Sequence, residues 1–171
     1  MNRKFHIMLD IDGVLATQNE FFCSRKRYHA VYDVYPFNKG CVEVFNSICE
    51  IIKPNIVLSS DWRIYYNIAQ MNEIFVWNNI KYPITDYTLN LWNELNTGDL
   101  SFIEECRARE ILKYVEDNKI GDYYLVLDDL DLSPFIPEKN FIRTPRQNEG
   151  IKQSGVLTKT INKYNQLRNE N

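Results

Sequence analysis

Two aspartates, Asp10 and Asp12, follow directly after a short apolar run at residues 5–9, with a single isoleucine between them. Carboxylates rarely lie at the end of a buried strand without a partner that neutralises them. Polar residues also follow two later apolar runs. They are Ser59, Ser60 and Asp61 after "IVL", and Asp128, Asp129 and Asp131 after "LVL". Of the last three, Asp131 is best interpreted as a loop residue.

Ligands of an open α/β sheet collect at the carboxyl ends of its strands. If the first and fourth strands are neighbours, Asp10, Asp12, Asp128 and Asp129 crowd into one small volume and repel one another strongly. A hard divalent cation with oxygen ligands removes that repulsion, and Mg²⁺ fits best. Such an ion takes one or two carboxylates, keeps some waters and holds a substrate phosphate. These spacings therefore predict a Mg²⁺ site that acts on a phosphorylated molecule.

Apolar patterning along the chain alternates between strand-like and helical segments. Strands are predicted at residues 5–9, 55–60, 80–87, 123–129 and 140–144, the third being weak because Pro83 suits an edge. Helices are predicted at residues 41–52, 63–79, 108–115 and 156–164. The alternation predicts an α/β protein, a Rossmann-like three-layer sandwich with a mainly parallel five-stranded sheet in the order 3-2-1-4-5.

Composition restricts the function classes further. The 171 residues suffice for a single domain, 1–171, and a net charge of −3 gives no broad cationic face. The four cysteines form no CxxC pair, which argues against a zinc site, and no apolar stretch is long enough for a membrane span. We expect a cytoplasmic protein with no membrane association and no evident stable protein partner.

Two stretches do not fit the strand–helix alternation. Residues 86–104 are polar and irregular, and residues 21–37 mix basic residues (Arg25, Lys26, Arg27) with aromatic ones. Both are too short to form a separate cap domain. The basic–aromatic segment either stacks bases and holds phosphates of a substrate, or is a flap or hairpin whose aromatic side chains pack on the domain, which we favour.

Four motifs in order, "DIDGVL", "IVLSSDWR", "CRAREI" and "LVLDDLD", resemble the haloacid dehalogenase-like (HAD) superfamily of phosphohydrolases over residues 10–131. The later stretch "FIRTPRQNEGI" is similar to the ends of small bacterial and phage members, including the HAD domain linked to RNA-repair proteins. The resemblance implies a small enzyme without a large cap domain, which leaves its site open to bulky substrates.

The resemblance implies a role for each matching residue. Asp10 is expected to attack phosphorus and form an aspartyl phosphate. Asp12 is expected to protonate the leaving oxygen and later to activate water, and Gly13 lets the chain turn sharply beside the metal. Asp10, Asp12, Asp128 and Asp129 are the expected metal site, with Asp12 contributing its backbone carbonyl.

The second and third motifs supply the phosphate contacts in the same comparison. Ser59 is expected to hydrogen-bond the phosphoryl oxygens, with Ser60 as the alternative, and Arg63 is a further candidate near the substrate. Arg107 takes a position where most members of the superfamily carry lysine, and arginine can grip phosphate oxygens in the same role. Arg109 and Lys113 lie on the same predicted helix and are alternatives for this position.

Simpler interpretations stay open at this point. Ser59 could cap the helix that follows it, and Arg107 could be a solvated helix residue. The leading function is a Mg²⁺-dependent phosphomonoester hydrolase that acts through an aspartyl phosphate on a phosphorylated small molecule or a nucleic-acid end. Alternatives are a polynucleotide end phosphatase acting on 3′ or 5′ nucleic-acid ends, and a non-catalytic phosphate- or metal-binding module. The intact Asp10–Asp12 pair favours an enzyme.

Overall fold

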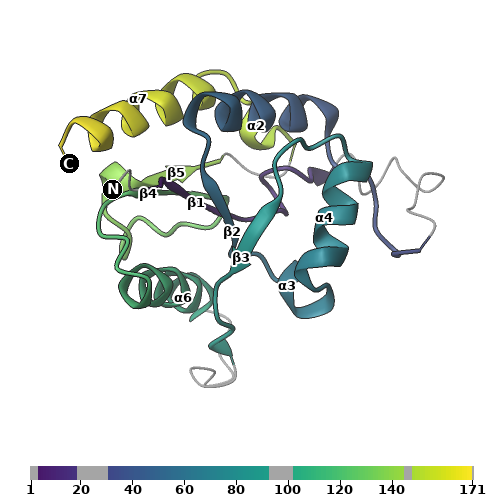
Figure 1. Ribbon diagram of the computed structural model, residues 1–171, viewed down its shortest axis with the longest axis horizontal. Coiled ribbons are helices and arrows are strands. Elements are labelled where there is room, and N and C mark those ends of the chain that lie inside the picture. The colour runs from purple at the N-terminus through teal and green to yellow at the C-terminus, as the bar shows by residue number, and fades with distance from the viewer. Residues whose placement is uncertain (1–3, 19–30, 93–101, 145–147, 171) are drawn as a thin grey trace.

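Five parallel strands form one sheet in the order β3-β2-β1-β4-β5. The computed structural model describes residues 4–18, 31–92, 102–144 and 148–170 (Figure 1). The strands are β1 (His6–Leu9), β2 (Asn55–Leu58), β3 (Ile84–Tyr87), β4 (Tyr124–Asp128) and β5 (Phe141–Arg143). The predicted fold class and strand order are confirmed.

Helices cover both faces of the sheet and complete a three-layer sandwich (Figure 1). Ile7 and Leu9 of β1 join the core beneath α2 (Lys39–Ile52), α4 (Ile68–Trp77) and α7 (Val156–Asn169). Met8 points to the opposite face and packs with α6 (Ile103–Asp117). This alternation is the period of two expected of a strand buried on both faces. Among the described residues, no large cap domain accompanies the sheet.

The single helix predicted over residues 63–79 was wrong, because two helices occupy this stretch. Helix α3 (Trp62–Tyr65) ends where Tyr66 adopts an extended backbone, and α4 begins at Ile68. Asn67 and Gln70 form a reciprocal capping box at the start of α4. The pattern N-x-x-Q is a helix-start signal in the sequence. The break lets α3 approach the carboxyl end of the sheet while α4 packs against the core.

The two irregular stretches are only partly described. Residues 19–30, which hold the basic cluster 25–27, and residues 93–101 lie outside the described residues. In the second half of the 21–37 segment, Val34 and Phe37 are buried in the core. The predicted 86–104 stretch overlaps the end of the edge strand β3 and the start of α6.

Two short 3₁₀ helices, η2 (Glu138–Asn140) and η3 (Gly150–Lys152), flank β5. In the described part of the chain, no helix has the length and apolar content needed to cross a bilayer. The cytoplasmic location stays a prediction.

Candidate active site

The register of the three central strands sets the geometry of the site. Leu9 of β1 pairs with Leu58 of β2 on one side and with Leu127 of β4 on the other. The next residue of each chain segment therefore emerges at the same edge of the sheet, and these residues are Asp10, Ser59 and Asp128. The polar residues that follow three separate apolar runs are thus brought together by parallel, in-register pairing.

Asp10, Asp128 and Asp129 form a cluster of three carboxylates with one oxygen each within 4.8 Å of the others. Two oxygens bound to one Mg²⁺ lie at most about 4.2 Å apart, which is twice the usual metal–oxygen distance. A small inward movement of these side chains therefore gives the spacing that Mg²⁺ needs. Oxygen-only donors of this charge fit a hard divalent cation.

Burial gives this cluster unusual protonation behaviour. It raises the pKa of Asp10 and of Asp128, which are 5% and 0% exposed, and the charge of Asp10 raises that of Asp128 further. Burial and then the charge of Asp10 raise the pKa of Asp129 to about 6. Carboxylates that hold protons this tightly lack enough positive charge nearby, which is the electrostatic deficit that a bound cation removes.

Gly13 allows the first loop to lie directly against the cluster. Its φ is +75°, and a Cβ at this position would lie 2.4 Å from the Asp129 carboxyl carbon. The loop is also tied to β5, because the buried Thr144 hydroxyl donates to the Gly13 carbonyl at 3.0 Å. The Thr144 backbone N–H donates to the Asp128 carbonyl at 2.9 Å. Thr144 therefore connects the first and last loops of the site.

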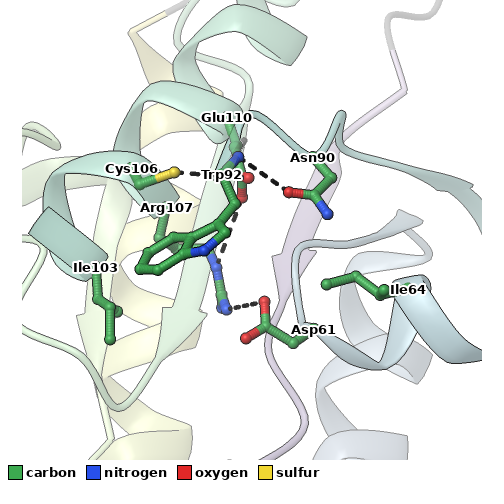
Figure 2. Close-up of a pocket in the computed structure, with 8 residues that line it drawn as sticks. All are labelled: Asp61, Ile64, Asn90, Trp92, Ile103, Cys106, Arg107 and Glu110. Carbon is green, nitrogen blue, oxygen red and sulfur yellow. Dashed lines mark hydrogen bonds and ion pairs between the residues drawn. The ribbon is translucent and has the colours of Figure 1, made fainter. Parts of the chain in front are cut away.

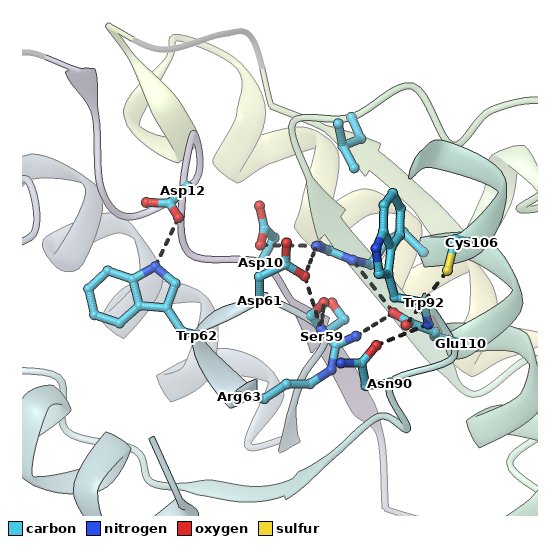
Figure 3. A network of polar contacts seen from close by, with 12 residues as sticks. Asp10, Asp12, Ser59, Asp61, Trp62, Arg63, Asn90, Trp92, Cys106 and Glu110 are labelled. Carbon is cyan, nitrogen blue, oxygen red and sulfur yellow. Dashed lines mark hydrogen bonds and ion pairs between the residues drawn. The ribbon is translucent and has the colours of Figure 1, made fainter. Parts of the chain in front are cut away.

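The carboxylate of Asp12 faces away from the cluster. It is exposed, and it accepts hydrogen bonds from the Tyr35 hydroxyl at 2.8 Å and from Trp62 Nε1 at 2.9 Å. Its side chain is therefore separate from the three clustered carboxylates, and only its backbone carbonyl stays a predicted metal ligand. Figure 3 shows Asp12 and Trp62 on one side of Asp10 and the arginine network on the other. Two aspartates two residues apart thus have distinct surroundings.

Arg107 is the cation of α6 that reaches the cluster. Its Nη1 lies 3.2 Å from both Asp10 and Asp128, and its Nη2 donates to Asp61 at 3.1 Å. Burial alone lowers the pKa of Arg107, but the surrounding carboxylates, Asp10 first, raise it above its usual range. The guanidinium is therefore permanently charged beside Asp10.

The two alternative cations of α6 lie elsewhere. Arg109 pairs with Glu105 and Lys113 pairs with Asp117, each within the helix and with the cation about half exposed. Of the three basic side chains considered for the third motif, Arg107 is the one that contacts the carboxylates of the strand ends.

A buried carboxylate, Glu110, holds both arginines of the site. Its Oε2 accepts a hydrogen bond from Arg63 at 2.5 Å and lies 3.8 Å from Arg107 Nε, and its Oε1 accepts from the Leu91 backbone N–H. Arg63 also donates to the Ser59 carbonyl at 2.6 Å. The Arg63 charge is therefore enclosed by protein groups, and it links the second motif to α6 (Figure 3).

The two serines of the second motif differ in their surroundings. The Ser60 side chain hydrogen-bonds to Asp10, which stabilises the ionised form of that carboxyl. The Ser59 hydroxyl is fully buried and has no hydrogen-bond partner among the described residues. Ser60 is thus the serine hydroxyl in contact with Asp10.

A pocket of about 200 Å³ opens beside Arg107 (Figure 2). It is lined by Asp61, Ile64, Asn90, Trp92, Ile103, Cys106, Arg107 and Glu110. Arg107 and Glu110 thus separate this pocket from the carboxylate cluster.

Five contributors to the site had no predicted role in it, although Asp61 was expected at this edge of the sheet. They are Tyr35, Asp61, Trp62, Glu110 and Thr144. The position of Glu110 could have been predicted from the sequence, because an acidic residue three positions after Arg107 lies on the same face of a helix. The others depend on contacts between separate elements.

Comparison with known proteins identifies a family for most of the chain. A family model described as "HAD domain in Swiss Army Knife RNA repair proteins" matches residues 6–156. The matched range includes every site residue named above. A comparison with curated protein sequences found no significant match.

Proposed function

Because the chain belongs to the family of HAD domains found in Swiss Army Knife RNA repair proteins, we propose that it is a Mg²⁺-dependent phosphomonoester hydrolase. The observation that supports this most is the position of Asp10. Its carboxylate shares a cluster of potential metal ligands with Asp128 and Asp129 and contacts the fixed charge of Arg107. A nucleophile for phosphorus needs this combination of a cation site and a permanent positive charge.

In the first half-reaction, a carboxylate oxygen of Asp10 attacks phosphorus and the bond to the leaving oxygen breaks. Asp12 gives its proton to that oxygen, so the alcohol departs neutral and an aspartyl phosphate remains. In the second half-reaction, Asp12 takes a proton from water, whose oxygen attacks phosphorus. Inorganic phosphate leaves and Asp10 is regenerated. The separate surroundings of Asp12 support this division of roles.

Charge neutralisation is divided among several groups. Mg²⁺ held by Asp10, Asp128 and Asp129 would offset the repulsion between the phosphate and the carboxylates. Arg107 supplies a second positive charge from the α6 side, and Ser60 supplies a hydroxyl beside Asp10. Arg63, enclosed by Glu110 and the Ser59 carbonyl, holds the second motif in place.

A second, narrower candidate is a polynucleotide end phosphatase. The family description names RNA-repair proteins. A broken strand that ends in a 3′-phosphate must lose that phosphate before its 3′-hydroxyl can be joined to a 5′-phosphate. The absence of a large cap domain from the described residues also supports a bulky substrate. A non-catalytic module with the same fold is less favoured, because it needs neither Asp12 nor the Trp62 and Tyr35 contacts that orient it.

A substrate panel tests both levels of the proposal. Purified protein should hydrolyse p-nitrophenyl phosphate with Mg²⁺ and lose this activity when EDTA is added. Oligonucleotides with 3′- or 5′-terminal phosphate, compared with phosphorylated metabolites, then identify the substrate class. Phosphate binding without turnover of any panel member would favour the non-catalytic alternative.

A further inference from the structure

A second pocket lies on the opposite side of Asp10 from Arg107, and the Asp12 carboxylate forms part of its wall. It has a volume of about 200 Å³ and is lined by Asp12, Asp33, Val34, Tyr35, Asp61, Trp62, Tyr65 and Tyr66. If Asp12 protonates the leaving oxygen, the group attached to that oxygen must lie next to Asp12. Asp12 also lines a cavity of about 220 Å³ beside Gly13 and Asp129, at the carboxylate cluster. Of the two cavities, only the present one contains Trp62, which hydrogen-bonds the Asp12 carboxylate, so we take it as the place where the leaving group begins.

The walls of this pocket are mostly aromatic. The Tyr35 and Trp62 rings meet edge to face, with centroids 6.0 Å apart at 82°, and Trp62 also packs against Tyr66 at 5.8 Å. Tyr65 lines the pocket and is 75% exposed, so its ring is accessible to a ligand. Aromatic side chains at such a site offer stacking surfaces for a planar ring.

The polar groups of the pocket restrict the occupant further. Asp33 and Asp61 are exposed acidic residues, and no lysine or arginine belongs to the lining among the described residues. Asp61 Oδ1 is already paired with Arg107, which leaves Asp61 Oδ2 and the Asp33 carboxylate as acceptors. Carboxylates repel a second phosphate held close to the leaving oxygen, but they accept hydrogen bonds from sugar hydroxyls and from base amino groups. The volume is below the range of about 300–1,000 Å³ typical of whole drug-sized ligands, so it suits one ring system at a time.

We propose that this pocket binds the nucleoside bonded to the phosphate that is removed, with its base stacked on Tyr65 and its hydroxyls near Asp33 and Asp61. The inference rests on the proposed phosphomonoesterase function and adds its leaving-group specificity. It assigns substrate selection to a surface formed by the loop before α2 and by α3, across Asp10 from the arginine network.

The test compares a substrate that carries a base with one that lacks it. We compare kcat/KM for ribose 5-phosphate with kcat/KM for whichever of 3′-AMP and 5′-AMP is hydrolysed faster. Both values are measured for the wild type and for the variants Tyr65→Ala, Tyr65→Phe and Tyr82→Ala. Tyr82, before β3 at the other end of the sheet, is the control tyrosine; it hydrogen-bonds Glu50 and is half-buried against the core. Removal of a stacking ring typically weakens binding of a base about 5- to 150-fold.

We expect Tyr65→Ala to lower kcat/KM for AMP about tenfold and to change kcat/KM for ribose 5-phosphate by less than twofold. Tyr65→Phe keeps the ring and should retain most of the activity, and Tyr82→Ala should resemble the wild type on both substrates. Equal losses on the two substrates, or no loss on either, would overturn the subsite.

A binding measurement separates this inference from the proposed function. If the wild type hydrolyses no phosphomonoester, the proposed function fails. Calorimetric titration with unphosphorylated adenosine then tests nucleoside binding in the pocket independently of turnover. Adenosine that binds the wild type and Tyr65→Phe but not Tyr65→Ala supports the pocket. Absence of adenosine binding to the wild type contradicts it.

Discussion

The indole of Trp62 donates a hydrogen bond from Nε1 to Asp12 Oδ2 at 2.9 Å, although 50 residues separate the two along the chain. Trp62 is only 8% exposed, and its ring is fixed by an edge-to-face contact with Phe37. An indole N–H can donate but cannot accept, so Trp62 orients the carboxylate without competing for its proton. The second motif therefore positions the proposed acid of the first.

Replacement of Trp62 by phenylalanine tests this relationship. The change removes the donor and keeps an aromatic ring, so the Asp12 carboxylate loses one of the two hydrogen bonds that it accepts from described residues. A hydrogen bond to a charged group contributes roughly 1.5–3 kcal/mol, so kcat should fall about tenfold or more for an alkyl phosphate. Turnover of p-nitrophenyl phosphate, whose leaving group needs little protonation, should fall less. A uniform loss on both substrates would show that Trp62 acts only through folding.

Glu110→Gln tests the buried network behind Arg107. The variant leaves the buried Arg63 guanidinium without its main carboxylate partner. Because breaking a buried ion pair on one side is costly, urea denaturation should show a loss of about 3 kcal/mol in the free energy of unfolding. The matched control is Glu105→Gln on the same helix, whose surface pair with Arg109 contributes about 1 kcal/mol or less. Similar losses in the two variants would contradict a special role for Glu110.

Gly13→Ala separates backbone strain from contact with the metal site. Gly155 has a similarly positive φ of +89°, but a Cβ added there meets no atom within 4 Å, whereas the added methyl group at Gly13 meets Asp129. Gly155→Ala is therefore the matched control. Both substitutions should lower the free energy of unfolding by about 1–2 kcal/mol, because alanine is strained in the left-handed backbone conformation. Only Gly13→Ala should also weaken Mg²⁺ binding, by about tenfold or more in a calorimetric titration. Unchanged Mg²⁺ affinity in Gly13→Ala would show that Asp129 is not a ligand.

The raised pKa of Asp129, about 6 in the folded protein against 3.8 for an ordinary aspartate, predicts an unusual pH dependence of stability. Between these values the folded protein binds more protons than the unfolded chain. The contribution of this group to stability is therefore present below about pH 4 and is lost as the pH rises through about 6. Mg²⁺ replaces the protons, so it should raise Tm more at pH 7.5 than at pH 5.

Thermal unfolding monitored by circular dichroism, with and without Mg²⁺, checks this dependence. Asp129→Asn is the matched variant, because it removes the titrating group while keeping the size of the side chain. The Tm of the metal-free wild type should fall relative to that variant as the pH rises from 4 to 7. A larger effect of Mg²⁺ at pH 5 than at pH 7.5 would be incompatible with a carboxylate metal site.

The residues that were predictable from sequence all follow strands directly. Asp10, Asp128 and Asp129 lie one or two residues after an apolar run, and the topology of parallel sheets brings such positions to one edge. Asp12 was expected to crowd with them, but its carboxylate turns away toward Tyr35 and Trp62. A local pattern combined with a general rule was therefore enough to predict the fold and the carboxylate cluster. Arg107 needed the motif as well, because spacing alone could not separate it from Arg109.

The contacts that complete the site were not predictable in the same way. Tyr35 reaches Asp12 from a loop without regular structure, and Thr144 reaches Gly13 across 131 residues. Such pairs depend on how side chains from different elements orient once packed, and no periodicity in the sequence encodes this. The two serines of the second motif are an example. The turn after β2 decides that Ser60 contacts Asp10 while the Ser59 hydroxyl is buried without a partner among the described residues.

The most direct test of the proposed mechanism is the turnover of p-nitrophenyl phosphate by Asp10→Asn in the presence of Mg²⁺, with circular dichroism of the same sample as the folding control. We predict that the variant loses at least about a thousandfold in kcat while its spectrum matches the wild type, because the amide cannot attack phosphorus. A folded Asp10→Asn variant that retains wild-type activity would contradict the mechanism.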